Sequence, residues 1–299
     1  MEANRKKKKR NLHLSHRLSG VLGTLAVIAA VGLCMVFEFG VFRMLPVSQE
    51  EAVSQEPRGQ GSYYAEQIEN SGRKKQETLP AGSRTEEKRQ VYLTFDDGPS
   101  KNTDRILDIL QEYGVKATFF VVGKTDASSV RAYKRIVEEG HTLGMHSYSH
   151  DYQELYCSLQ SFSEDLARLQ EYLYDLTGVW SRYYRFPGGS SNTVSATDMQ
   201  LLIRYLNENG ICYYDWNVAS GDAVSSKLSA EVIAQNCITQ IEGKKECMIL
   251  FHDASDKGST VDALPMLIEQ LQSMEDTEIL PVTDDTHPVQ HVTDQNKKQ

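Results

Sequence analysis

Two adjacent aspartates, Asp96 and Asp97, directly follow a short apolar segment of this 299-residue chain. The segment Val91–Phe95 is β-branched and aromatic, which predicts a buried strand, and Gly98-Pro99 should end it. Two like charges side by side repel each other, and burial of an unpaired carboxylate is costly. We therefore expect a cation beside at least one of the two, although a solvated Asp-Gly turn after a strand would show the same residues.

His146 and His150 form a second candidate group. A separation of four residues places both imidazoles on one face of a helical turn, where they can reach one cation. Alone, such a pair more often belongs to the surface or the core. Next to a carboxylate pair at a neighbouring strand end, it favours a metal site of two imidazoles and one carboxylate. Three protein ligands leave one position open for water, as in catalytic sites.

Ionisable residues also follow three later strands of the predicted fold. They are Arg185, then Asp215 with Asp222, and then His252 with Asp253. Each of them has an ordinary explanation as a surface or core side chain. Their joint placement at strand ends is harder to explain in a purely structural protein, and it favours a shared site.

Segments typical of strands and helices alternate from residue 89 to residue 283. Strands are expected at 91–95, 117–121, 142–145, 183–185, 211–215, 248–251 and 279–282, and helices at 103–112, 128–139, 158–176, 196–207, 229–241 and 261–273. Repeated β-α units with apolar strands indicate a parallel sheet with both faces covered. The sequence therefore predicts an α/β fold, a distorted and incomplete (β/α) barrel of about seven strands. In such barrels the chemistry gathers at the carboxyl ends of the strands, where the residues above should meet.

The N-terminal region predicts a single transmembrane anchor. Residues 1–18 hold seven basic residues and one acidic residue, and residues 20–37 carry no charge. At 1.5 Å per residue, the largely apolar segment 19–43 is long enough to cross a hydrocarbon core of about 30 Å. The basic residues place the N-terminus in the cytoplasm and the rest of the chain outside the cell. A cleaved signal peptide is the alternative, but the apolar run is long and no small-x-small site follows it closely.

Three further regions complete the predicted domain organisation. Residues 44–88 are polar with few aliphatic side chains, so we expect a disordered linker. The folded domain should cover residues 89–283, and the polar tail 284–299 should be disordered.

The net charge is −9, and because residues 1–18 contribute +6, the remainder carries −15. An acidic exported region argues against a nucleic-acid partner.

Five segments of the predicted domain resemble, in order, the signatures of the polysaccharide deacetylase family, which is also called the NodB homology domain or carbohydrate esterase family 4. The segments are Thr94–Gly98, His146–His150, Arg185–Pro187, Trp216–Asp222 and Leu250–His252. The resemblance implies a distorted β/α barrel, in agreement with the strand count above. Members of this family are metal-dependent amidases that remove N-acetyl groups from chitin-like or peptidoglycan sugars, and some are esterases.

The resemblance also implies a role for each matched residue. Asp97, His146 and His150 would be the ligands of a divalent metal, usually zinc. Asp96 would be the general base, held beside Arg185.

The same resemblance makes His252 the general acid, with Asp222 tuning it. Asp215 is the alternative partner of this histidine. The spacing after Trp216 favours Asp222.

The remaining matched residues would bind substrate, and they are Pro187, Gly188, Trp216 and Leu250. Trp216 and Leu250 would line the acetyl pocket, and the Gly188 N–H would help to bind the oxyanion. The family often has an aromatic residue in place of Gly188 and a tryptophan in place of Ala223. Both changes remove bulk near the cleft, which favours a wider site that accepts N-acetylmuramic acid.

These observations predict a membrane-anchored, metal-dependent N-deacetylase. Its substrate would be the N-acetylglucosamine or N-acetylmuramic acid of cell-wall peptidoglycan, or a chitin-like oligosaccharide. One alternative is an O-acetyl esterase of the acetyl xylan type. A non-catalytic glycan-binding relative is the other, but all the ligands and both acid–base residues are present. The sequence does not indicate an oligomeric state.

Overall fold

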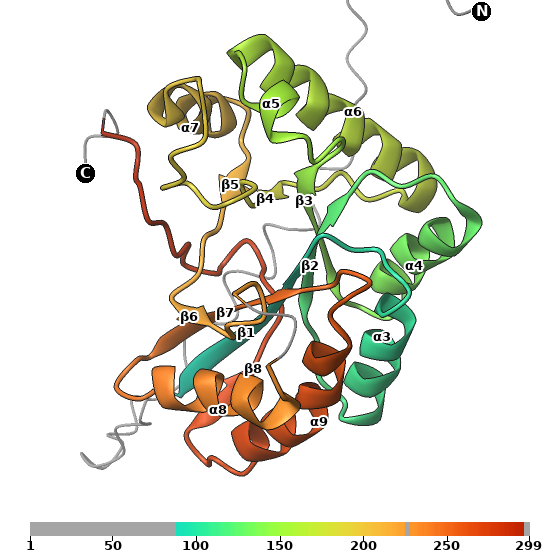
Figure 1. The fold of residues 1–299 in the computed structure, drawn as a ribbon, viewed down its shortest axis with the longest axis vertical. Coiled ribbons are helices and arrows are strands. Elements are labelled where there is room, and N and C mark those ends of the chain that lie inside the picture. Colours follow the sequence, from blue (N-terminus) through green and yellow to red (C-terminus); the bar gives the residue numbers. More distant parts are fainter. Residues whose placement is uncertain (1–87, 225–227, 296–299) are drawn as a thin grey trace, which may run out of the picture. The chain divides into compact units, whose positions relative to one another are not determined.

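The computed structural model describes residues 88–224 and 228–295 of the chain, shown in Figure 1. They form a curled parallel sheet surrounded by helices, consistent with a distorted (β/α) barrel. The strands of this part of the chain are β1 (Arg89–Asp96), β2 (Thr118–Val122), β3 (Thr142–Ser147), β4 (Tyr183–Tyr184), β5 (Cys212–Tyr213), β6 (Val218–Ala219), β7 (Glu246–His252) and β8 (Thr277–Ile279). Its helices are α3 (Thr103–Glu112), α4 (Ala127–Glu138), α5 (Tyr152–Leu155), α6 (Leu159–Thr177), α7 (Met199–Glu208), α8 (Ala230–Gln240) and α9 (Gly258–Gln272).

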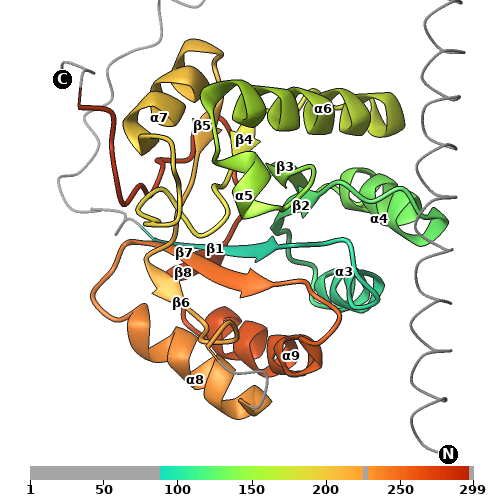
Figure 2. The same ribbon diagram turned by 45° about the horizontal axis from the view of Figure 1, so that its top comes forward.

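The strand order is β5-β4-β3-β2-β1-β7-β6, and β8 pairs with the beginning of β1. No ladder joins β5 to β6 within the described residues, so the sheet stays open between them. Figure 2 shows α6 on one side of the central strands β1 and β7, and α8 with α9 on the other. The incomplete barrel that the sequence predicts is therefore present as an open, curled sheet.

Alternating residues of each strand face two different cores. In β1, Val91, Leu93 and Phe95 belong to the main core beneath the helices, whereas Tyr92 belongs to a smaller cluster inside the curled sheet. Because side chains of a strand alternate between its two faces, Asp96 shares the inner face with Tyr92. This burial on both faces explains why the strands read as continuous apolar runs.

The register of β1 against β7 brings two predicted site residues together. The two strands are parallel, and Asp96 is the direct partner of His252. Paired residues of neighbouring strands lie on the same face of a sheet. Asp96 and His252 are therefore neighbours at the carboxyl ends of the two central strands.

Two short elements are absent from the sequence prediction, β6 and α5. β6 has two residues and α5 has four, so neither carries a periodic pattern long enough to detect. α7 begins at Met199, later than the predicted start at residue 196. The Asp198 side chain accepts a hydrogen bond from Gln200 N at 3.0 Å and caps the helix at this point.

The prediction of a disordered tail is wrong for residues 284–295, which pack on the domain. Val289 O accepts a hydrogen bond from Asp215 N at 2.7 Å, and Val292 O accepts one from the Tyr213 hydroxyl. Val289 also packs against the cluster inside the sheet. The polar composition was misleading because loops of the barrel, rather than water, satisfy the backbone groups of this segment.

Within residues 88–224 and 228–295, no helix has the length and apolar character needed to cross a bilayer. The predicted basic N-terminus 1–18, the anchor 19–43 and the linker up to residue 87 lie outside the described residues. They remain predictions from the sequence.

Candidate active site

The predicted metal ligands converge at the carboxyl ends of β1 and β3. Asp97 follows β1, His146 lies in β3, and His150 follows β3. One ligand atom from each of the three side chains lies within 4.8 Å of the others. Asp97 Oδ1 is 3.6 Å from His146 Nε2 and 3.2 Å from His150 Nε2. The sequence predicts these three residues as metal ligands, and the fold brings them together.

The donor set and its spacing fit a small divalent cation. Zinc bonds of about 2.0–2.2 Å in a tetrahedral site place neighbouring ligand atoms about 3.3–3.5 Å apart. The two distances from Asp97 Oδ1 bracket this value. Two imidazole nitrogens with one carboxylate oxygen are also a donor set that zinc prefers. The three side chains thus have the chemistry and the separation that a metal site of this kind requires.

His146 is held in the tautomer that a metal ligand needs. Its Nδ1 lies 2.7 Å from the carbonyl oxygen of Arg185. Since a carbonyl only accepts hydrogen bonds, Nδ1 must carry the proton, and the lone pair of Nε2 faces Asp97. Burial lowers the pKa of His146, which keeps the ring neutral.

The Asp97 carboxylate is ionised for a related reason. Burial by itself would raise its pKa, but the hydrogen bond to His150 and the nearby His146 and His252 bring the pKa well below its usual range. Burial opposes the charge of His150, yet its hydrogen bond to Asp97 raises the pKa of this imidazole. Asp97 and His150 therefore stabilise each other at the carboxyl ends of β1 and β3, with Oδ1 and Nε2 3.2 Å apart.

Two of the three candidate ligands have an uncommon backbone conformation. Asp97 has a φ of 72° and His150 a φ of 52°, both in the left-handed region. Residues other than glycine adopt this region rarely, and such residues concentrate at functional sites. The backbone conformation of Asp97 and His150 is thus a second feature, independent of the side-chain types, that marks them as a candidate functional site.

Asp96 and Arg185 form a buried ion pair inside the curled sheet. Arg185 is fully buried and Asp96 is 3% exposed. Arg185 Nη1 donates to Asp96 Oδ1 at 2.9 Å and to Thr94 Oγ1 at 2.7 Å. The guanidinium also donates to two backbone carbonyl groups and lies over the Phe120 ring at 4.3 Å. The described residues donate no hydrogen bond to Asp96 Oδ2, so this oxygen is available to accept a proton.

His252 pairs with Asp222 rather than with Asp215. His252 Nδ1 lies 2.8 Å from Asp222 Oδ1, and Asp222 Oδ2 accepts hydrogen bonds from His252 N and from Thr260 Oγ1. Burial alone would lower the pKa of His252, but the hydrogen bond and the charge of Asp222 raise it. Burial alone would raise the pKa of Asp222, but its hydrogen bond to His252 and the charge of His252 lower it. An imidazole held in this way is suited to donate a proton from Nε2.

Asp215, the alternative that the sequence left open, holds the loop after β4 instead. Its carboxylate is fully buried and accepts hydrogen bonds from Ser190 N at 2.8 Å, from Ser190 Oγ and from His291 N at 2.7 Å. The loop of residues 186–190 contains the expected oxyanion donor. Asp215 thus ties this loop to the C-terminal segment.

Three of the four predicted substrate residues lie in or beside this loop, and the fourth, Leu250, lies in β7. Pro187 is buried, and its carbonyl group accepts a hydrogen bond from the Tyr156 hydroxyl at 2.8 Å. Gly188 is exposed, with a φ of 77° that only glycine adopts readily. Trp216 lies beside Gly189, the residue after Gly188. A Cβ atom on Gly189 would lie 3.0 Å from the Trp216 ring. Leu250 lies two residues before His252 in β7 and faces the same side of the sheet.

Tyr152 of α5 and Asn192 of the same connection lie in the space where the sequence predicted extra room at Gly188. A Cβ atom on Gly188 would lie 3.3 Å from Asn192 Cβ and 3.3 Å from the hydroxyl oxygen of Tyr152. An aromatic side chain is absent from position 188, but an aromatic ring is nevertheless present beside it. Gly188 therefore gives no support to a wider cleft.

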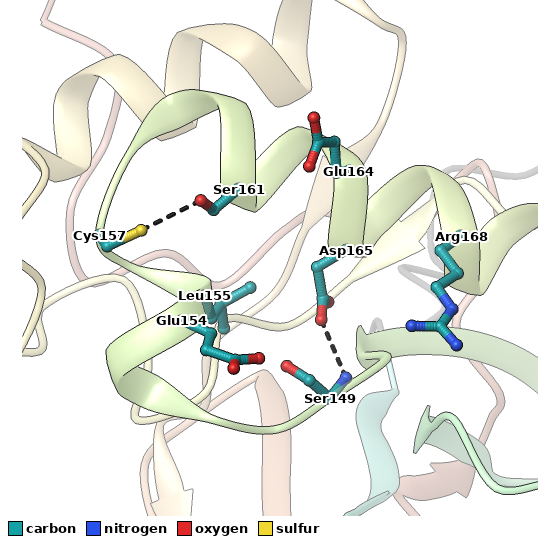
Figure 3. A pocket seen from close by; sticks show the side chains of 8 residues that line it. All are labelled: Ser149, Glu154, Leu155, Cys157, Ser161, Glu164, Asp165 and Arg168. Atoms are coloured by element: carbon teal, nitrogen blue, oxygen red, sulfur yellow. Dashed lines mark hydrogen bonds between the residues drawn. The ribbon is translucent and has the colours of Figure 1, made fainter. Parts of the chain in front are cut away.

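Asp165 of α6 positions the histidine loop, defined as residues 147–150. Its carboxylate accepts hydrogen bonds from Ser147 Oγ, Tyr148 N and Ser149 N at 2.7–2.9 Å. Figure 3 shows Asp165 pointing from the helix towards the Ser149 amide, beside an open pocket between the loop and α6. Ser147 Oγ in turn accepts a hydrogen bond from His150 N at 2.9 Å. Asp165 is therefore connected to a candidate metal ligand through one hydroxyl.

Two further polar side chains, Lys124 and Asp253, hold the loop after β1. Lys124 Nζ donates to the carbonyl oxygens of Asp97 and Pro99. Asp253 is fully buried and accepts hydrogen bonds from Ser100 Oγ and Thr103 Oγ1, and its burial raises the pKa of this carboxyl to about 6. A Cβ on Gly98 would lie 2.4 Å from Asp253 Oδ2, which explains the glycine after the two aspartates.

Sequence reasoning missed the supporting residues Asp165, Lys124 and Tyr152. Each is one polar or aromatic side chain in a segment with an ordinary helical or loop pattern, so no local signal distinguishes it. Asp253 is different, because it directly follows His252 at a strand end and the sequence placed it among the ionisable residues there.

Comparisons with known proteins agree with this geometry. The sequence model of a family described as polysaccharide deacetylase matches residues 83–203. The chain is similar to YheN of Bacillus subtilis (strain 168), with 35% identity over 185 residues, which are 61% of this chain and 63% of YheN. The chain thus spans less than two thirds of that relative. It is also similar to a peptidoglycan-N-acetylglucosamine deacetylase of Bacillus cereus, with 32% identity over 199 residues, covering 65% of this chain and 70% of that protein.

Solved structures give the same result. The structure is similar to that of the catalytic domain of peptidoglycan N-acetylglucosamine deacetylase from Eubacterium rectale, with a TM-score of 0.65 and 36% sequence identity. The similarity covers 72% of this chain and 96% of that domain.

Proposed function

Because this chain belongs to the polysaccharide deacetylase family, we propose that it hydrolyses the acetamido groups of N-acetylated sugars in cell-wall peptidoglycan with the help of a divalent metal. One observation carries the proposal. A zinc-type triad of Asp97, His146 and His150 stands at the same strand ends as a buried carboxylate, Asp96, and a carboxylate-bound imidazole, His252. The names of the Bacillus cereus and Eubacterium rectale relatives support peptidoglycan as the substrate.

Asp97, His146 and His150 would hold the metal. Zinc at a site of this kind polarises a carbonyl group and eases the ionisation of water. The chain's contribution is to fix the three donor atoms. His146 is fixed by the Arg185 carbonyl group, and His150 by the Asp165 hydrogen bonds to its loop. Such outer contacts orient the ligands of a metal.

Asp96 would act as the general base. Amide hydrolysis requires a group that takes a proton from the attacking water, within hydrogen-bond reach of it. Arg185 fixes Oδ1 of Asp96 and leaves Oδ2 to accept the proton. The buried guanidinium also compensates the charge of the carboxylate before the proton arrives.

The Gly188 N–H would act on the carbonyl oxygen of the amide, and His252 would act on its nitrogen. The N–H group is held by a loop that Asp215 and Tyr156 fix, and it would donate to the carbonyl oxygen as negative charge develops there. His252 would protonate the sugar nitrogen as the C–N bond breaks. Asp222 stabilises the charged imidazolium and raises the pKa of His252, which favours the protonated form that an acid requires.

We also propose, from the sequence alone, that the protein is anchored in the cell membrane. Residues 19–43 would anchor the enzyme in the cell membrane, with the N-terminus in the cytoplasm and the catalytic domain outside, next to the wall. Proteolysis of intact cells from which the wall has been removed tests this. The catalytic domain should be digested while an epitope at the N-terminus survives, and protection of both would refute the orientation.

The test of activity uses the full-length protein in detergent on purified peptidoglycan. After digestion to disaccharides, mass spectrometry should find sugars that have lost one acetyl group, and fragmentation locates the free amine on N-acetylglucosamine or N-acetylmuramic acid. A strong preference for chitin oligomers over wall glycan would remove peptidoglycan from the proposal. Acetate release from acetylated xylan, with none from N-acetylated sugars, would establish an esterase instead.

A further inference from the structure

Tyr152 lies beside Gly188, whose N–H is the expected oxyanion donor. Tyr152 is the first residue of α5, two residues after His150. A Cβ atom on Gly188 would lie 3.3 Å from the Tyr152 hydroxyl oxygen and 3.4 Å from its Cε1. The phenol end of Tyr152 therefore lies beside the loop at which the carbonyl oxygen of the substrate is expected to bind.

The Tyr152 ring is fixed between the metal site and this loop. It packs edge-on against His150, with ring centroids 5.5 Å apart, and against Tyr156 at 5.9 Å. The Tyr156 hydroxyl donates to the carbonyl oxygen of Pro187, so the same aromatic pair also contacts the residue before Gly188. Asp151 accepts hydrogen bonds from Gln153 N and Glu154 N and fixes the turn that presents the ring. A preorganised group of this kind loses little entropy when it binds substrate.

The Tyr152 hydroxyl has no hydrogen-bond partner among the residues that the structure describes, although the side chain is only partly exposed. In contrast, the Tyr156 and Tyr133 hydroxyls each donate to a backbone carbonyl group. A tyrosine hydroxyl is both a donor and an acceptor. An unused donor at a candidate active site, next to an expected oxyanion donor, indicates a role in binding substrate.

We propose that the Tyr152 hydroxyl is a second oxyanion donor, which acts beside the Gly188 N–H on the carbonyl oxygen of the acetyl group. The inference rests on the proposed deacetylase function. When the oxygen of water bonds to the carbonyl carbon, the C=O π electrons move to the carbonyl oxygen. Tyr152 donates a hydrogen bond to that oxygen and keeps its own proton. The C=O double bond re-forms as the C–N bond breaks, and His252 supplies the proton that the departing nitrogen takes.

This role explains why the loop has glycine where the family often has an aromatic residue. A side chain at position 188 would displace Tyr152, because a Cβ alone would already be in close contact with it. In this chain the aromatic group at the site comes from α5 instead, and it carries a hydroxyl that points towards the loop.

Tyr152→Phe in the full-length, zinc-loaded protein tests the proposal. The variant keeps the ring and its contact with His150 and removes only the hydroxyl. Loss of one oxyanion donor typically lowers kcat by about 10²–10³. We expect a fall in kcat of about 10²-fold with little change in KM, because the hydrogen bond strengthens only in the transition state. Zinc affinity, measured by competition with a chelator, should be unchanged.

Tyr174→Phe is the matched control. Tyr174 is 48% exposed on α6, and its loss of a hydroxyl should leave kcat as it is. Unchanged kcat in Tyr152→Phe, or a raised KM at constant kcat, would overturn the proposed donor while the deacetylase function stands. If the unmodified protein releases no acetate from any N-acetylated glycan, the proposed function fails, and this inference fails with it.

Discussion

Asp165 holds the histidine loop without being a metal ligand, so its substitution tests whether the loop is built to position His150. Asp165→Asn preserves the shape of the side chain but replaces one carboxylate oxygen by an NH₂ group. Both oxygens of Asp165 accept hydrogen bonds from the loop, Oδ1 from Ser147 and Tyr148 and Oδ2 from Ser149. In either orientation of the asparagine amide, its NH₂ group faces at least one N–H or O–H group of the loop that needs an acceptor. At least one hydrogen bond is therefore lost.

The size of the effect follows from these contacts. A hydrogen bond to a charged group contributes about 1.5–3 kcal/mol, and the variant loses at least one. If the loop must recover this free energy when it binds zinc, the affinity falls by about 10- to 100-fold, since about 1.4 kcal/mol corresponds to a factor of ten. Loss of an outer partner of a metal ligand typically has an effect of this size.

The assay is a zinc titration of the chelated protein against a competing chelator, for the unmodified protein and both variants. Glu164→Gln is the control, because Glu164 neighbours Asp165 on α6 but is exposed, and its carboxylate accepts a hydrogen bond from Gln160 on the same helix. Circular dichroism of the metal-free proteins should show that all three are folded. Equal zinc affinity in Asp165→Asn and Glu164→Gln, with the fold intact, would refute the positioning role.

Three other perturbations have clear expected outcomes. Asp96→Asn should retain zinc but lose turnover by about 10²–10⁴-fold, the usual contribution of a general base, and full activity would refute the assignment. Asp222→Asn removes the charge that raises the pKa of His252, so the pKa of this acid falls and the alkaline limb of the kcat profile moves to lower pH. A profile identical to that of the unmodified protein would show that Asp222 does not tune the acid. Deletion of residues 284–299 removes Val289 and the backbone contact to the Asp215 carboxylate, and kcat should fall although the thermal unfolding transition remains cooperative. Unimpaired activity of this truncated protein would show that the tail does not support the site.

The arrangement of the strand ends could be predicted from the sequence because it depends on local patterns. Strands that are apolar on both faces predict a covered parallel sheet, and the carboxyl ends of such strands meet at one edge. These patterns predict that Asp97 lies close to His146 and His150. In the structure the three side chains are within reach of one cation. The spacing after Trp216 also favoured Asp222 over Asp215 as the partner of His252, and the hydrogen bond of 2.8 Å agrees.

The supporting contacts could not be predicted in the same way. Asp165 and Tyr152 act through groups that lie close only after folding, and neither breaks the local pattern of its segment. The order of the C-terminal segment could not be predicted for a related reason. The composition of a segment indicates whether the segment can form a core of its own. Residues 284–295 do not form one; they pack against the core and hydrogen-bond to the loops of the domain.

Binding of zinc by the three candidate ligands can be measured in a crystal of the protein grown with zinc, with diffraction recorded on both sides of the zinc absorption edge. We expect a single strong anomalous peak between Asp97 Oδ1, His146 Nε2 and His150 Nε2, at bonding distance from all three atoms. If the folded protein shows the three side chains turned apart with no ion between them, the metal-dependent mechanism is wrong.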